Sequence, residues 1–104
     1  MEKQMIKVRA TKRGIRLWIE GSRLHGAGFV RGASYTRDVD CYNGKGVITL
    51  RLNQDGDKKV SGKTKAGSDH AIIDITASKC FEGFAIGQDV EVTYHNRAIY
   101  LEAK

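Results

Sequence analysis

The side chains best suited to chemistry in this sequence are basic, and they fall into two groups. The first 37 residues hold nine lysines and arginines against two acids, and residues 58–65 add four lysines and no acid. The whole chain has 18 basic and 12 acidic residues, so the remainder is net acidic. Two basic clusters on an acidic background favour a polyanionic partner, and nucleic acid is the commonest polyanion.

Eight of these side chains are the candidate nucleic-acid contacts. They are Lys7, Arg9, Lys12, Arg13, Arg16, Lys59, Lys63 and Lys65. Contacts to phosphate make affinity salt-sensitive, whereas arginines on base edges supply sequence specificity. We expect DNA as the partner, with RNA as an open alternative. The competing interpretation is a solvated basic face that aids solubility.

Patterns typical of enzymes and metal sites are weak. Gly62-Lys63-Thr64 resembles the end of a phosphate-binding loop, but Asp57 stands where that loop needs glycine. The histidines have no partner at metal-ligand spacing, and residues 68–70 are too close in sequence to converge as a triad. A pair such as His25 with Glu20 could act as general acid and base, which leaves a weak ribonuclease as an open alternative. We predict a protein that is not an enzyme, with no catalytic residue, metal or other cofactor.

Aromatic residues give a mixed signal. Trp18 alternates with apolar neighbours, so it is expected to face away from them, beside Arg16. There it either stacks on a base or packs on the outside of the fold, and packing is favoured. The tyrosines are spread along the chain and predict no compact stacking platform; they are Tyr35, Tyr42, Tyr94 and Tyr100.

Most of the chain has the alternation of period two that predicts half-buried strands, as at residues 15–19, 47–52 and 90–94. Asn43-Gly44 and His95-Asn96 lie between such runs and predict hairpin turns. Two windows break the alternation, residues 22–28 and 77–83. They predict helices of about two turns, the first capped by Ser22 and stopped by Gly28.

The chain also aligns with itself. Lys7-Val8 corresponds to Lys59-Val60, and the GFxxG segment at residues 28–32 corresponds to the one at 83–87. We predict one domain, residues 1–104, made of two β-β-α-β-β pseudo-repeats. The repeats cover residues 4–52 and 58–104, joined by a polar loop.

Neither half can bury a sufficient core alone, so the halves are expected to interleave into one mostly β, barrel-like core with pseudo-twofold symmetry. This symmetry is expected to bring the two basic turns side by side, where they could straddle a duplex.

These segments resemble a known family. Residues 15–24 followed by 27–32 are similar to the SymE-like branch of the AbrB/MazE/SpoVT swapped-hairpin family. Residues 59–63 and 72–74 are similar to an N-terminal extension of some phage and bacterial DNA cytosine methyltransferases. The resemblance implies a swapped-hairpin barrel, and DNA contact through the residues near the first strand, here Lys7, Arg9, Lys12 and Arg13. AbrB-like chains carry one copy and dimerise; this chain carries both halves, which implies a monomeric pseudo-dimer or a homodimer.

We therefore expect a small DNA-binding protein, either a transcriptional regulator or an accessory protein of a phage or plasmid. Two alternatives stay open. One is an inhibitor that binds a host defence protein complex, of the anti-restriction or anti-CRISPR type. The other is a SymE-like toxin acting on nucleic acid, which would need His25 or Arg23. Because Cys41 and Cys80 form no CxxC and no apolar run is long enough to span a membrane, we expect a reduced, cytoplasmic protein without a membrane partner.

Overall fold

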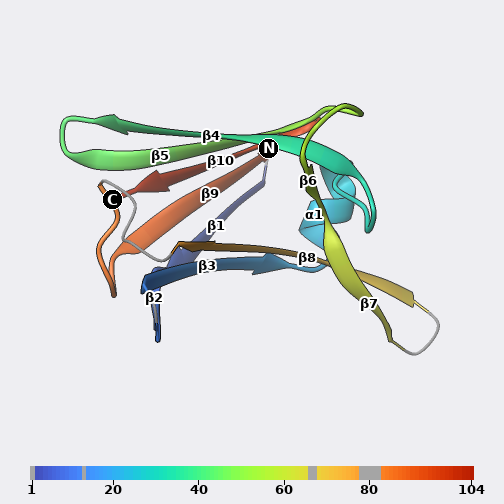
Figure 1. Ribbon diagram of the computed structural model, residues 1–104, viewed down its shortest axis with the longest axis horizontal. Coiled ribbons are helices and arrows are strands. Elements are labelled where there is room, and N and C mark those ends of the chain that lie inside the picture. The colour runs from blue at the N-terminus through green and yellow to red at the C-terminus, as the bar shows by residue number, and fades with distance from the viewer. Residues whose placement is uncertain (1, 13, 66–67, 78–82) are drawn as a thin grey trace.

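A computed structural model describes residues 2–12, 14–65, 68–77 and 83–104, with the backbone alone at 63–65, 68–69 and 77. The described residues form ten strands and one short helix, arranged in two antiparallel sheets (Figure 1). The prediction of a mostly β protein is confirmed. Within these ranges, no helix has the length and apolar character needed to cross a membrane.

The larger sheet has six strands and the smaller has four. The six-stranded sheet runs, in spatial order, β1 (Glu2–Lys7), β9 (Asp89–His95), β10 (Ala98–Ala103), β5 (Lys45–Leu52), β4 (Ser34–Tyr42) and β6 (Lys58–Lys59). The four-stranded sheet runs β2 (Arg9–Thr11), β3 (Gly14–Glu20), β8 (Ser68–Ala77) and β7 (Ser61–Lys65). The helix α1 (Ser22–Gly26) follows β3.

The strand order is symmetric about the middle of each sheet. Exchanging β1–β5 with β6–β10 reverses the order of both sheets and changes nothing else. The first strand of each half pairs with the other half, β1 with β9 and β6 with β4. This exchange gives the two halves a shared core, as their small size requires. An origin of the chain by duplication stays a prediction.

Each half opens on a strand that passes from one sheet to the other. The bends lie at Val8, between β1 and β2, and at Val60, between β6 and β7. At each bend the backbone exchanges two hydrogen bonds with the last glycine of a GFxxG segment and the residue after it. Val8 N donates to Gln88 O (2.9 Å), and Val8 O accepts from Gly87 N (2.8 Å). Val60 N donates to Ala33 O, and Val60 O accepts from Gly32 N (both 2.9 Å). Gly32 and Gly87, the last glycines of the two repeated segments, therefore hold the two bends. Their φ angles are near +88° and +84°, values that residues with a side chain rarely adopt.

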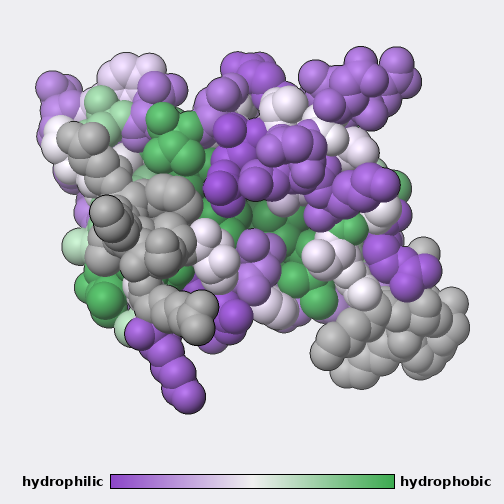
Figure 2. Space-filling view, viewed as in Figure 1, coloured by the Kyte–Doolittle hydropathy of each residue, from purple (hydrophilic) through white to green (hydrophobic). Residues whose placement is uncertain are grey.

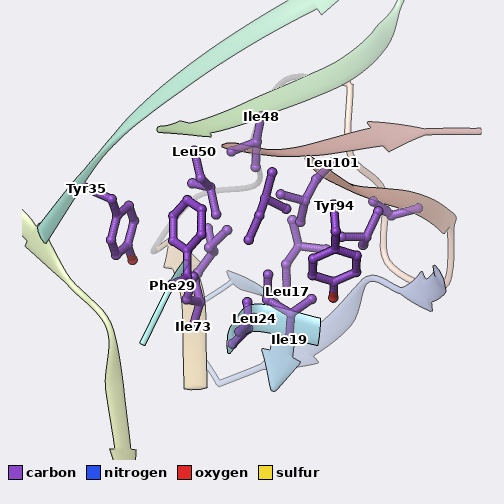
Figure 3. Close-up of a cluster of buried hydrophobic side chains, with 14 of the residues drawn as sticks. Leu17, Ile19, Leu24, Phe29, Tyr35, Ile48, Leu50, Ile73, Tyr94 and Leu101 are labelled. Atoms are coloured by element: carbon purple, nitrogen blue, oxygen red, sulfur yellow. The ribbon is translucent and has the colours of Figure 1, made fainter. Parts of the chain in front are cut away.

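The core lies between the two sheets. The inward residues of β3, Ile15, Leu17 and Ile19, are almost fully buried, as the alternation predicted. They face Ile48, Leu50 and Leu101 of the six-stranded sheet, with Leu24 of α1 and the aromatic rings of Phe29 and Tyr35 completing the cluster (Figure 3). Burying each such side chain contributes about 1.5–3 kcal/mol.

The prediction of a barrel-like architecture is wrong, because the described residues form two open sheets and no closed barrel. β2 pairs with β3 only from Thr11 opposite Gly14 to Arg9 opposite Arg16. The strand before it, β1, pairs with β9 of the other sheet. The rest of that edge of β3 has no described strand beside it, so the sheets do not close around the core.

The local predictions were partly right. Asn43-Gly44 forms a two-residue hairpin turn with both φ values positive, and residues 53–57 connect the halves. The other hairpin turn lies one residue later than predicted, at Asn96-Arg97, because β9 continues to His95.

The cap of α1 is Gly21, not Ser22, and makes no side-chain hydrogen bond, while Gly28 ends the segment at φ +89°. Of the predicted second helix, Ala77 belongs to β8 and residues 78–82 lie outside the described residues.

Candidate nucleic-acid interface

The predicted contact residues divide between the two ends of the four-stranded sheet. Near the β2–β3 turn lie Lys7 at the end of β1, Arg9 in β2, Lys12 in the turn and Arg16 in β3. At the other end lie, by backbone register, Lys63 opposite His70 and Lys65 opposite Ser68. Lys59 of β6 lies before the bend at Val60 and pairs with Ser34 of the six-stranded sheet. Arg13 lies outside the described residues, as do the side chains of Lys63 and Lys65.

The prediction that the two basic turns lie side by side is wrong. β3 and β8 are antiparallel, with Ile15 opposite Ala77 and Glu20 opposite Ile72. Thr11 and Gly14, which end β2 and begin β3, therefore lie beyond the C-terminal end of β8, whereas Lys65 of β7 lies at its N-terminal end, so the two basic segments occupy opposite ends (Figure 1). Ten residues of β8 lie between them, which at ~3.4 Å per residue is roughly 34 Å.

Two arginines face each other at the β2–β3 end. Arg9 is directly opposite Arg16 in the antiparallel pair, so both side chains leave the same face of the sheet. Like charges at such positions are destabilising. The Nε atom of Arg16 is buried and lies 3.1 Å from Asp74 Oδ1 without the alignment of a hydrogen bond, and its guanidinium lies 5.5 Å from the centre of the Trp18 ring. Asp74 thus compensates one arginine, and no ion pair is described for Arg9.

A groove of about 620 Å³ runs beside these residues. It opens where the chain bends at Val8. Because β2 pairs with β3 but β1 pairs with β9, the edge of β3 at Trp18 and Glu20 has no described strand beside it. Lys7, Arg9 and Trp18 line it, together with the carboxylates of Glu20 and Asp89. Trp18 is half-buried and faces away from the core, as predicted, so its ring forms part of the groove wall.

Acidic side chains temper the charge of this region. Lys7 Nζ lies 2.7 Å from Asp89 Oδ1. Glu20 Oε2 lies 3.0 Å from His70 Nε2, so the structure pairs this carboxylate with His70, whereas sequence reasoning had singled out His25. Arg23, the other residue assigned to a toxin, forms an ion pair with Glu2 at 2.7 Å.

Two further groups have shifted pKa values for evident reasons. Burial raises the pKa of Tyr94 to about 12, and its hydroxyl donates a hydrogen bond to Gln4 Oε1 at 2.8 Å. Hydrogen bonds from Lys3 and Lys104 lower the pKa of Glu91, and both ammonium groups lie 3.0 Å from its carboxylate. Neither group lines the groove.

Sequence reasoning missed a cluster on the outer face of the six-stranded sheet, formed by Arg51, His95 and Tyr100. Arg51 comes from β5, which is about fifty positions away in the sequence from the β9–β10 hairpin that carries His95 and Tyr100. The two hairpin turns were the one sequence signal for this cluster. They fix the register within the β4–β5 and β9–β10 hairpins, but they do not fix the pairing of β5 with β10 that brings Arg51 to Tyr100. Hydrophilic side chains dominate the face seen in Figure 2, with apolar ones showing between them. Among the described residues, no three His, Cys, Asp or Glu side chains converge to hold a metal ion.

A comparison of the chain with protein-family models gave no match, and comparisons with curated proteins and with solved structures gave none either. The resemblance to the swapped-hairpin family therefore stays a prediction, and the functional argument rests on the residues themselves.

Proposed function

We propose that this protein binds duplex DNA through the outer face of its four-stranded sheet. The primary contact is the basic end formed by Lys7, Arg9, Lys12 and Arg16. The observation that carries the proposal is the pair Arg9 and Arg16, directly opposite each other and next to a groove with an aromatic wall. The fold tolerates a repulsive pair at this point, and a phosphate between the two guanidinium groups would remove the repulsion.

The second basic end completes the footprint. Lys59, Lys63 and Lys65 belong to the strands related to β1 and β2 by the symmetry of the sheets. The ends are roughly 34 Å apart along β8, close to one turn of B-DNA at ~34–36 Å. Phosphates one turn apart on the same side of a duplex therefore match the two ends, in place of the single straddled site that the sequence suggested.

Duplex binding measured against salt tests this proposal. Lys7 and Arg16 are already paired with carboxylates, so we expect Arg9 and Lys12 at the β2–β3 end to neutralise about two phosphates, giving a log–log slope near −2. A duplex of about 8 base pairs should show this slope, and one of about 16 base pairs, long enough to reach both ends, a slope nearer −5.

The matched variants are R9A/K12A, which should weaken binding to both duplexes, and K45A, which removes an exposed charge beside the β4–β5 turn of the other sheet. Affinity that does not change with salt, equal slopes for both lengths, or equal effects of R9A/K12A and K45A would contradict the proposal.

One observation favours the second candidate, an inhibitor that binds a host protein. The outer edge of β1 and the edge of β3 beyond Arg16 have no described strand partner, and Met5 between them is 57% exposed. Free edges of this kind accept an extended segment of another protein. Under this candidate a stoichiometric protein is retained from nuclease-treated lysate, and the added charge of M5K abolishes its retention. Retention of nucleic acid alone would reject it.

A further inference from the structure

The outer face of the six-stranded sheet carries a small group of side chains that the groove does not use. Tyr100 lies in the central strand β10, with Thr93 directly opposite on β9 and Thr49 directly opposite on β5. His95 and Arg51 are both opposite Ala98, two residues before Tyr100 on the same face. Because alanine is small, the two longer side chains have room to lean toward the tyrosine ring.

The contacts within this group are those of a stacking platform. The His95 ring meets the Tyr100 ring edge to face, with centroids 4.8 Å apart and an interplanar angle of 86°. The guanidinium carbon of Arg51 lies over the same ring at 6.0 Å. Arg51 is exposed, whereas His95 and Tyr100 are half-buried, so the ring system supports the guanidinium from below.

The charges around the platform are uneven. No carboxylate partner is described for Arg51, or for Arg97 in the turn whose carbonyl accepts a hydrogen bond from Leu52 N. On β9 and β10 the nearest carboxylates of this face, Glu91 and Glu102, lie one register row beyond Tyr100. On β4, Asp38 lies opposite Thr49 and diagonal to Arg51. Glu91 is engaged by two lysines at 3.0 Å. A phosphate is therefore favoured at the Ala98 end of the platform, near Arg51 and Arg97, and disfavoured toward Glu91, Glu102 and Asp38.

We infer that this cluster is a binding site for an unpaired base of single-stranded nucleic acid. The base stacks on the exposed guanidinium of Arg51, which the Tyr100 ring supports from below, and the adjoining phosphate lies toward Arg51 and Arg97. Duplex bases are already stacked on their neighbours and have no free face to offer, so this site selects unpaired nucleotides. The inference extends the proposed function to a second ligand form, bound on the outer face of the six-stranded sheet at residues that do not line the groove.

A pair of labelled oligonucleotides tests the stacking directly. One is a single-stranded oligothymidylate of about ten nucleotides, a length within the span that single-strand-binding folds cover. The other has the same sugar-phosphate chain without bases. Fluorescence anisotropy then gives the affinity of each for wild-type protein and variants. We expect Y100A to weaken binding of oligothymidylate about 5- to 150-fold and to leave the abasic oligomer within about twofold.

Two conservative variants separate stacking from charge and from folding. R51K keeps the positive charge and loses the planar guanidinium, so it should weaken oligothymidylate and spare the abasic oligomer. Y100F keeps the ring and should bind like wild type. K45A, on the same face at the β4–β5 turn, is the control for loss of an exposed charge.

The outcomes are distinct from those of the duplex experiment. Platform variants should leave duplex affinity unchanged, and R9A/K12A should leave the difference between oligothymidylate and the abasic oligomer unchanged. The inference is overturned if R51K binds oligothymidylate like wild type, if Y100A and Y100F behave alike, or if the variants weaken both oligomers equally. It is also overturned if wild type does not distinguish the two oligomers. If duplex binding alone fails, the proposed function falls and the platform stands.

Discussion

The arginine pair at the β2–β3 end leads to a prediction in which stability and binding change in opposite directions. Replacing Arg9 by glutamine keeps much of the side chain and removes one of two like charges that face each other directly. Such pairs cost about 0.2–1 kcal/mol. Asp74 lies 3.1 Å from Arg16 and compensates part of its charge, so the lower half of that range applies, about 0.2–0.5 kcal/mol. For a domain of this size that gain raises Tm by about 1–4 °C.

The assay is thermal unfolding at two salt concentrations, together with duplex binding. At about 0.01 M salt the gain of R9Q should be visible, and at about 1 M it should vanish because the screening length falls to ~3 Å. In a D74N background, Arg16 has lost its compensating carboxylate, so the gain from R9Q should be larger there. Over the same series R9Q should weaken duplex binding and make the salt slope less steep by about 0.9.

The control is K45Q, which removes an exposed positive charge beside the β4–β5 turn of the six-stranded sheet, whereas both arginines belong to the four-stranded sheet. It should change neither Tm nor the salt slope. The reasoning is refuted if R9Q lowers Tm at low salt, if its effect is the same at both salt concentrations, or if K45Q reproduces it.

Three other predictions concern the fold and its titrating groups. In denaturant unfolding, G83A should destabilise the protein by at least ~1 kcal/mol more than G87A. Both glycines have φ near +84°, but a Cβ at residue 83 would meet the backbone of Gly46, whereas a Cβ at residue 87 would meet nothing within 4 Å. Equal losses of stability would contradict this prediction. Tyr94 has a raised pKa, so its contribution to stability is complete below pH 10 and is lost as the pH rises toward about 12. The difference between the ultraviolet titrations of wild type and Y94F should show one component with a midpoint near 12. A midpoint near 10 would contradict the prediction. Glu91 has a lowered pKa, so its contribution is present above about pH 4.5 and is lost as the pH falls through the folded value; E91Q should flatten the acid side of the stability curve, and an unchanged curve would rule this out.

Local features of the chain were readable because they depend on neighbours in sequence. The alternation at residues 15–19 places Leu17 in the core and Trp18 outside, since successive side chains of a strand point to opposite faces. The Asn43-Gly44 turn was predicted because its backbone requires two positive φ angles, which asparagine and glycine tolerate best. The repeated GFxxG segments were also visible, although their role in holding Val8 and Val60 was not.

The sequence by itself thus determined the strands, their buried faces and the internal likeness of the two halves. Only the tertiary structure decided where the basic residues lie. β3 pairs with β8 in antiparallel register, and a symmetry axis between two antiparallel strands sends equivalent turns to opposite ends. The Arg51, His95 and Tyr100 cluster depends in the same way on the pairing of β5 with β10, which joins residues about fifty positions apart. Local propensity does not encode such pairings, because they are selected by the joint burial of both halves around one core.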